Sequence, residues 1–327
     1  YGGAPWWITE TFNCVDGRAA VTFVTLAGIG AVLLSRDARA SDDPARRRAA
    51  RTRLFYRSMF VLALGVFNFQ VWPGDILHFY GLYMATGALV LYAKPGRLLL
   101  IAACAVLIMY AIAALFPEVV GYGRIGHWYP DYLTVRGFFR NEFINGGHAY
   151  FPWVAYYLFG MWLAQQRIDD PRWRVRALAM AFTGIALCEL VRAVWFRTEW
   201  PIAGPDLRDA RDYMVPDLGD LFRMGSLQCT AVAIIILCLF LAEARPHAPA
   251  VGALAATGRM ALTHYLAHTI LVLGPLFIVG QLDYDHSRWT SLALALAFCT
   301  AAVTFSTLWK RRYRQGPLEA IMRRVCG

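Results

Sequence analysis

The stretch Leu98–Phe116, LLLIAACAVLIMYAIAALF, contains no charged residue and is long enough to cross the hydrocarbon core of a membrane as one helix. Such a crossing takes about 20 residues, each rising about 1.5 Å along the helix axis. The rest of the chain is similar, since 58% of its 327 residues are hydrophobic, only 17% are charged, and the mean hydropathy is +0.43. This composition predicts an integral membrane protein.

Eight further apolar segments resemble this stretch. They mix Gly, Ala and Thr with large apolar residues and show no sustained alternation with a period of two, which favours packed helices over barrel strands. We therefore predict an all-α, polytopic transmembrane helix bundle with about nine spans. The predicted spans are Ala19–Ser35, Leu54–Trp72, Ile76–Ala93, Leu98–Phe116, Tyr150–Gln165, Ala177–Phe196, Leu221–Ala244, Met260–Gly280 and Ser291–Trp309.

Arginine and lysine are concentrated in alternate connections between these segments. The first reads RDARASDDPARRRAARTR (residues 36–53), and the C-terminal tail reads KRRYRQGPLEAIMRRVCG (residues 310–327). Positive residues remain on the cytoplasmic side, which predicts a cytoplasmic tail and an external Tyr1. We therefore expect a further helix, or a processed leader, ahead of Tyr1. The net charge of +10 indicates contacts with membrane lipids and not with nucleic acid.

Two outer segments carry the candidate catalytic residues. In WPGDILHFYGLY (residues 72–83), Asp75 and His78 have the i, i+3 spacing that places both on one face of a helix, where a carboxylate can orient an imidazole as a general base. The alternative is that Asp75 caps the helix and His78 lies among the headgroups. In NGGHAYFPW (residues 145–153), His148 either points inward towards His78 or belongs to an interfacial aromatic belt.

A third segment, TGRMALTHYLAH (residues 257–268), places His264 and His268 on one helix face, about a turn after Arg259. Two imidazoles at this spacing can bind a metal, but no acidic third ligand follows in the segment. Hydrogen bonding between helices is the favoured role for these polar residues. The seven cysteines have irregular spacings and indicate neither a disulfide framework nor a zinc site.

Charged residues within the predicted spans are candidates for substrate binding. Glu189 and Arg192 have an i, i+3 spacing that allows them to pair within one helix. Arg57 and Arg223 lie near opposite ends of their helices, where each either holds an anionic group of a substrate or extends to the headgroups.

Motifs in the C-terminal half carry a family resemblance. GRMALT lies within LAATGRMALTHYLAHTILVL (residues 254–273), and GPLE lies within FSTLWKRRYRQGPLEAIMRR (residues 305–324). With GDIL (residues 74–77) and GGHAYFPWVAYYLFGMWLAQ (residues 146–165), they resemble the YeiB-like family of bacterial membrane proteins from about Leu54 onward. The family has Asn at the position of His264 and commonly Gln at that of His268, which argues against a metal there. The resemblance also implies the bacterial cytoplasmic (inner) membrane.

This family is similar in helix layout to transmembrane acyltransferases such as heparan-alpha-glucosaminide N-acetyltransferase. Those enzymes move an acyl group from a coenzyme A thioester to a sugar hydroxyl or amine, and the heparan type uses a histidine in the first outer loop. The corresponding stretch here, YGGAPWWITETFNCVDGRAA (residues 1–20), contains no histidine. The resemblance implies acetyl-CoA or another acyl-CoA as donor, with no metal.

Two hypotheses follow. The first is an acyltransferase-like protein whose outer vestibule, built from Asp75, His78 and His148, acts on an extracytoplasmic glycan or lipid near the loops 117–147 and 197–219. The second is a non-catalytic subunit that binds other membrane proteins, or a carrier for a lipid or small solute. We divide the chain into an N-terminal bundle with the vestibule (1–166) and a C-terminal YeiB-like region (167–327), packed as one membrane domain.

Overall fold

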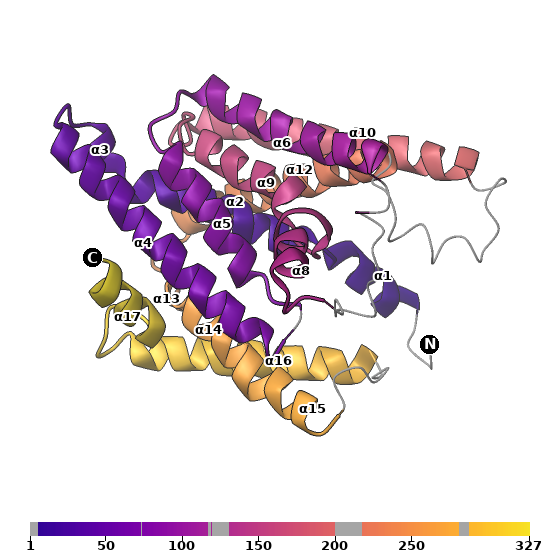
Figure 1. Cartoon of the computed structure of the whole chain (residues 1–327). Coiled ribbons are helices and arrows are strands. Elements are labelled where there is room, and N and C mark those ends of the chain that lie inside the picture. The colour runs from indigo at the N-terminus through magenta and orange to yellow at the C-terminus, as the bar shows by residue number, and fades with distance from the viewer. Residues whose placement is uncertain (1–5, 73, 117–118, 120–130, 200–217, 281–287) are drawn as a thin grey trace. The chain divides into compact units, whose positions relative to one another are not determined.

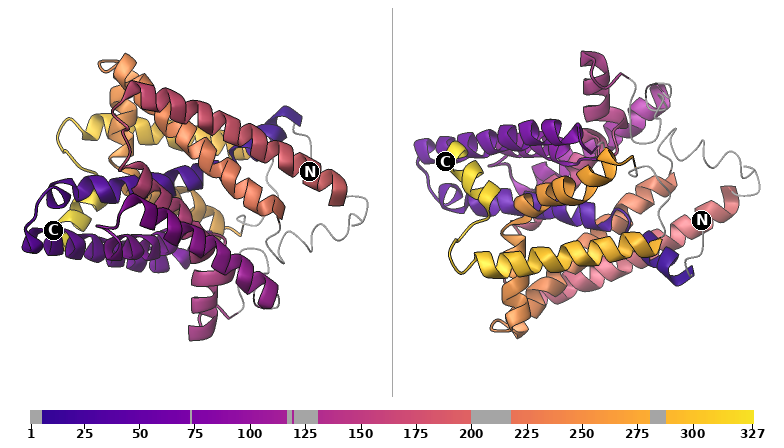
Figure 2. Two further views of the ribbon diagram at one scale, coloured as in Figure 1. Left: turned by 90° about the horizontal axis from the view of Figure 1, so that it is seen from above. Right: turned by 90° about the horizontal axis from the view of Figure 1, so that it is seen from below.

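The computed structural model describes residues 6–72, 74–116, 119, 131–199, 218–280 and 288–327. Every element in these ranges is helical and none is a strand (Figures 1 and 2), which confirms the all-α prediction. The elements are α1 (Trp6–Val15), α2 (Arg18–Leu34), α3 (Arg36–Arg39), α4 (Pro44–Phe69), α5 (Leu77–Leu89), α6 (Pro95–Leu115), α8 (Val135–Arg140), the π-helix η1 (Asn141–Asn145), α9 (Tyr150–Leu163), α10 (Pro171–Glu199), α12 (Leu218–Ala244), α13 (Pro249–Gly258), α14 (Ala261–His268), the π-helix η2 (Thr269–Leu273), α15 (Gly274–Ile278), α16 (Arg288–Trp309) and α17 (Pro317–Cys326).

Five helical segments of the described residues are long and apolar enough to cross a membrane, which makes the chain a multi-pass membrane protein. They are Pro95–Leu115, Pro171–Trp195, Leu218–Ala244, Ala261–Ile278 and Trp289–Trp309. Each of the other four predicted spans is also helical. However, α2, α5 and α9 are shorter than a full crossing, and α4 begins with the arginine-rich run of the first connection.

The chain forms two compact units, which we call unit 1 and unit 2. Unit 1 contains residues 1–16, 66–75 and 237–327, and unit 2 contains residues 17–65 and 76–236.

Helix α9 is the centre of unit 2, where it packs against α2, α5 and α6 (Figure 1). Its Tyr157, Leu158 and Met161 are fully buried. Glycines allow the backbones of α2 and α9 to touch, because a Cβ on Gly28 would overlap the Tyr157 carbonyl and one on Gly160 would overlap the Thr25 carbonyl. Small residues at such crossings are the usual way in which membrane helices approach closely.

Helix α5 is held in the same way against α4. A Cβ on Gly65 would meet the His78 backbone, at 2.6 Å from its Cα atom, and a Cβ on Gly81 would lie 2.6 Å from the Cα atom of Leu62. The glycines therefore allow the backbones of α4 and α5 to touch. His78 lies at this contact, and its side chain has no exposed surface.

In unit 1, α13 packs against α16, and the last helix, α17, packs against α14. Proline in the first turn starts both α13 and α17, where a missing N–H group has no helical partner to lose. The rings of Trp7 and Trp289 meet edge to face, with their centroids 6.0 Å apart.

Candidate functional site

A buried histidine and a buried glutamate face each other in unit 2. The Nε2 atom of His78 lies 3.5 Å from the Oε1 atom of Glu142, and the two side chains are 0% and 1% exposed. His78 is on the first turn of α5, and Glu142 is on η1. A carboxylate in this position can select the tautomer of the imidazole and stabilise its protonated form.

Glu142 is presented by an unusual backbone. Thr134 is the N-cap residue of α8, and its hydroxyl accepts the Gly137 N–H group at 3.0 Å; α8 then continues into the π-helix η1. Within η1 the Asn141 amide donates to Glu142 Oε1 at 3.4 Å. Single π-helical turns occur frequently at functional sites.

His148 approaches the same aromatic ring as His78. The centroid of Phe79 lies 4.0 Å from that of His78 and 6.3 Å from that of His148. The His148 ring packs edge-on against Trp153, with centroids 4.4 Å apart, and its backbone carbonyl accepts a hydrogen bond from the Tyr83 hydroxyl. His148 is thus half-buried in an aromatic cluster, and Phe79 is the neighbour that it shares with His78.

The structure corrects the predicted role of Asp75. Helix α5 begins at Leu77, so Asp75 precedes the helix and does not share a face with His78. The N-cap residue of α5 is Ile76, not Asp75. Asp75 belongs to unit 1, where it is buried and accepts hydrogen bonds from the Asn68 amide at 2.7 Å and from the Tyr265 hydroxyl at 3.0 Å. The carboxylate beside His78 is that of Glu142.

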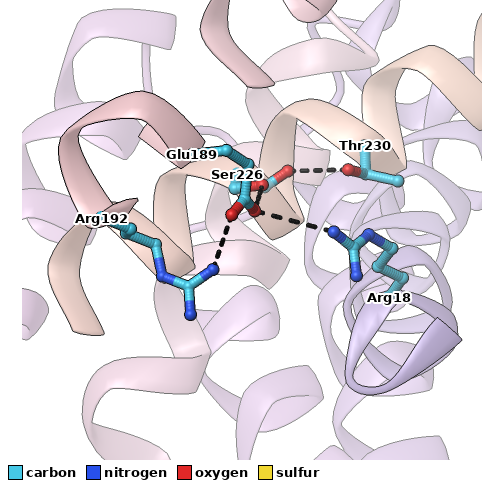
Figure 3. Close-up of polar contacts among 5 residues, drawn as sticks. All are labelled: Arg18, Glu189, Arg192, Ser226 and Thr230. Carbon is cyan, nitrogen blue, oxygen red and sulfur yellow. Dashed lines mark hydrogen bonds and ion pairs between the residues drawn. The ribbon is translucent and has the colours of Figure 1, made fainter. Parts of the chain in front are cut away.

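The predicted pair of Glu189 and Arg192 is present and belongs to a larger cluster (Figure 3). Arg192 Nη1 donates to Glu189 Oε2 at 2.7 Å, which confirms the pairing within α10. Two residues from other helices meet the other carboxylate oxygen: the Ser226 hydroxyl of α12 donates to it at 2.6 Å, and Arg18 of α2 lies 3.7 Å from it. The cluster therefore joins three helices of unit 2 through one carboxylate.

The other two arginines proposed to bind substrate lie on different helices of unit 2. Arg57 is half-buried on α4, and Arg223 is exposed on α12, one turn before Ser226. Gly17, which precedes α2, has a left-handed φ of 71°, and a Cβ there would lie 3.9 Å from Arg223 Nη2. Glycine adopts this conformation without strain, and the start of α2 lies within van der Waals range of Arg223.

In unit 1, His264 makes the predicted hydrogen bond between helices. Its Nε2 atom lies 2.6 Å from the Ser306 hydroxyl of α16. His268 packs edge-on against Phe298, with ring centroids 5.2 Å apart, and Arg259 is exposed at the C-terminal end of α13. The described part of the chain contains no group of three or more potential metal ligands.

The GRMALT and GPLE motifs meet in unit 1. Glu319 Oε1 accepts the backbone N–H groups of Leu262 at 2.8 Å and Thr263 at 3.1 Å, and its Oε2 accepts the Thr263 hydroxyl at 2.5 Å. Thr263 Oγ1 in turn accepts the Leu318 N–H group at 3.1 Å. The N–H groups of Leu262 and Thr263 belong to the first turn of α14 and have no partner within that helix. The tail therefore caps α14 and brings the two motifs into contact.

Sequence reasoning missed Glu142, Arg18, Ser226 and Glu319 as partners. Glu142 lies within the loop 117–147, and its closeness in sequence to His148 is the signal that could have indicated it. Most of the loops expected to bind an acceptor, at residues 117–118, 120–130 and 200–217, lie outside the described residues.

Two family profiles match the chain. The profile described as "Heparan-alpha-glucosaminide N-acetyltransferase, catalytic" matches residues 2–193, which include His78, Glu142 and His148. The profile described as "Protein of unknown function (DUF418)" matches residues 160–326, which include the GRMALT and GPLE motifs.

Two curated proteins are similar over part of their length. The chain is 37% identical to the "Uncharacterized protein YeiB" of Escherichia coli (strain K12) over 73 residues, which are 22% of this chain and 19% of that protein. It is 39% identical to the "Uncharacterized 39.9 kDa protein in amylase 3'region" of Bacillus acidopullulyticus over 69 residues, which are 20% of this chain and 19% of that protein. The matched stretch thus spans about a fifth of each relative. No solved structure shows a significant match.

The YeiB-like resemblance is confirmed by these matches, and each profile covers more than half of the 327 residues. The chain therefore belongs to the DUF418 family of proteins of unknown function and, through residues 2–193, to the family of the heparan-alpha-glucosaminide N-acetyltransferase catalytic region, which makes it an acyltransferase-like, multi-pass membrane protein.

Proposed function

We propose that the protein is a bacterial inner-membrane acyltransferase that moves an acyl group from a coenzyme A thioester to an extracytoplasmic sugar or lipid acceptor. The observation that carries this proposal is the buried pair of His78 and Glu142, which lies within the stretch matched by an acetyltransferase catalytic profile. The tail is cytoplasmic in this proposal, because the basic connections alternate along the chain.

The pair fits the chemistry of acyl transfer. A coenzyme A thioester supplies an electrophilic carbonyl and a thiol leaving group, so the protein must remove a proton from the acceptor. A histidine can take that proton near neutral pH, and a hydrogen-bonding carboxylate improves it as a base by stabilising the imidazolium. Burial of Glu142 strengthens this effect because water does not screen the pair.

In the proposed reaction, His78 carries one proton from the acceptor to the leaving thiolate. His78 Nδ1, the ring nitrogen opposite the one that faces Glu142, accepts the proton of the acceptor hydroxyl or amine while the new C–O or C–N bond forms at the acyl carbon and the C–S bond breaks. The imidazolium then returns the proton to the departing sulfur. Glu142 remains ionised throughout and acts as a positioning residue. Asn141, which donates to the same carboxylate oxygen, holds Glu142 in place.

The arginines have subordinate roles in this proposal. Arg57 and Arg223 remain the candidates for donor phosphate, since a guanidinium group binds phosphate through two parallel hydrogen bonds. Glu189 and Arg192 belong to the cluster of Figure 3. In this proposal that cluster contributes to acceptor binding by holding the helices of unit 2 in place.

The decisive experiment follows release of free coenzyme A thiol by the full chain in lipid nanodiscs, with acetyl-CoA and glucosamine as substrates. Replacing His78 by Gln should lower kcat by about 10²-fold or more, because a general base contributes about 10²–10⁴-fold. Glu142→Gln should lower kcat with little change in KM, and Glu142→Asp should recover part of the loss. His268→Gln is the matched control, since it removes another membrane histidine and should leave kcat within about twofold.

An active His78→Gln variant would exclude this base. If the wild-type chain bound no coenzyme A ester in calorimetry, the enzyme proposal would fail as a whole. The remaining hypothesis would then be an accessory subunit or a carrier, and cross-linking in the native membrane would test for a protein partner.

A further inference from the structure

We propose that Arg39, Arg47, Arg51 and Tyr92 form a binding site for a phosphate group at the arginine-rich end of unit 2. This site does not depend on acyl transfer, and it would remain if the protein proved not to be an enzyme.

Tyr92 is the centre of the cluster. It follows the C-terminal end of α5, and its hydroxyl donates to the backbone carbonyl of Arg47 on α4 at 2.8 Å. The guanidinium carbons of Arg47 and Arg51 lie 5.6 and 5.5 Å from the centroid of its ring. Both distances are within the range of cation–π contacts, which hold a guanidinium flat and leave its N–H edge available.

Arg39 brings a third positive charge to this end of unit 2. It is half-buried, donates to the Leu91 carbonyl next to Tyr92, and donates to Gln165 Oε1 at 2.7 Å. Both acceptors are neutral, so they orient the guanidinium without cancelling its charge. Burial lowers the pKa of Arg39 from its ordinary value, Tyr92 opposes that shift, and Arg47 adds to it. Arg47 is therefore close enough to Arg39 for the two charges to repel each other.

The charges around Tyr92 are poorly compensated. Arg47 donates to the Ser41 carbonyl at 2.9 Å and lies 3.7 Å from Asp42, whose carboxylate is fully exposed and contributes little. Arg47 and Arg51 are four residues apart on one helix face, which is an unfavourable spacing for like charges. An anion bound between them removes this repulsion.

The chemistry of the site favours phosphate. A guanidinium group forms two parallel hydrogen bonds with phosphate oxygens, and two or three such groups match a group with several anionic oxygens. Arginines that only set membrane topology have no need of fixed side chains. Here Arg39 and Arg47 are held by hydrogen bonds, and the Tyr92 ring lies within cation–π distance of both Arg47 and the exposed Arg51.

Two sources could supply the phosphate: a soluble molecule such as coenzyme A, or the headgroup of an anionic lipid. The test uses the full chain purified in an uncharged detergent. The soluble probes are coenzyme A and inorganic pyrophosphate, measured by calorimetry. The lipid probe is dioctanoyl phosphatidylglycerol, and dioctanoylglycerol serves as its phosphate-free control.

The double variant Arg47→Gln/Arg51→Gln should weaken binding of the recognised probe by about tenfold or more, because each removed guanidinium takes away charge-assisted hydrogen bonds. The variant Arg48→Gln/Arg53→Gln removes the same charge from the same helix and should change affinity by less than about twofold. Arg51→Gln alone provides a milder test, since Arg51 is exposed and its replacement leaves the bonds of Arg39 and Arg47 in place. Arg51→Lys keeps the charge and should recover only part of the affinity.

Saturable binding of coenzyme A or pyrophosphate that depends on Arg47 and Arg51 would support the site and identify a soluble ligand. Binding of phosphatidylglycerol alone would support it and identify a lipid. Equal losses in the two double variants, or no saturable binding of any phosphate probe, would overturn the proposal. Loss of turnover in the His78 variant is measured separately, so failure of this site and failure of the proposed enzyme can be told apart.

Discussion

The Glu319 carboxylate accepts the Thr263 hydroxyl at 2.5 Å and so ties the last helix of the chain to the first turn of α14. This contact connects residues far apart in sequence, and it completes a helix N-terminus that otherwise has unpaired N–H groups. It also gives a structural reason for a glutamate in the tail that no proposed chemical step uses.

Replacing Glu319 by Ala removes the acceptor for two backbone N–H groups and one hydroxyl. We expect a loss of about 1–3 kcal/mol of stability, in line with the loss of a helix cap and of charge-assisted hydrogen bonds. Thermal unfolding of the purified protein in detergent measures the change. Asp37→Ala, at an exposed position of α3, is the control and should leave the unfolding temperature unchanged.

The glycines of α2 offer a test of helix packing with an internal control. Gly28→Ala places a methyl group against the Tyr157 carbonyl, so we expect about 1–3 kcal/mol of destabilisation from overpacking. Gly30→Ala meets no atom within 4 Å and should stabilise the helix by about 0.5–1 kcal/mol. Thermal unfolding of the two variants should therefore shift in opposite directions. Equal shifts would mean that α2 and α9 do not touch at Gly28.

The paired charges of α10 should be energetically coupled. A double-mutant cycle with Glu189→Gln and Arg192→Gln should give a coupling energy of about 1 kcal/mol, since the pair is half-buried and lies at hydrogen-bond distance. The pair of Asp43 and Arg46 has the same i, i+3 spacing but lies 3.7 Å apart on an exposed surface. Its coupling energy should be close to zero. Similar values for the two pairs would show that the cluster of Figure 3 adds nothing to the stability of unit 2.

The two buried carboxylates should behave differently in the transfer assay. Asp75→Asn retains an oxygen that accepts hydrogen bonds from Asn68 and Tyr265, so activity should stay within a few fold. Glu142→Gln removes the charge beside His78 and should lower kcat by about tenfold or more. A larger loss of kcat in Asp75→Asn than in Glu142→Gln would support the prediction, made from residue spacing, that Asp75 orients the base.

Local geometry explains why part of the site was predictable. Glu189 and Arg192 are three residues apart in one helix, and this spacing alone places them together. The role of His264 followed from a polar side chain on a membrane helix, which needs a partner on a neighbouring helix. The shared helix face of Asp75 and His78 was wrong because α5 starts only at Leu77, so Asp75 lies outside the helix that carries His78.

The sequence by itself determined the class of protein and the position of its helices, because a chain in a bilayer must satisfy its backbone hydrogen bonds within each long apolar segment. Only the tertiary structure decided which polar groups meet. Glu142 reaches His78, and Arg18 and Ser226 reach Glu189, through the packing of helices whose order in the chain does not encode their neighbours. Those contacts depend on close backbone approaches at glycines such as Gly65 and Gly28, which no hydrophobic pattern reveals.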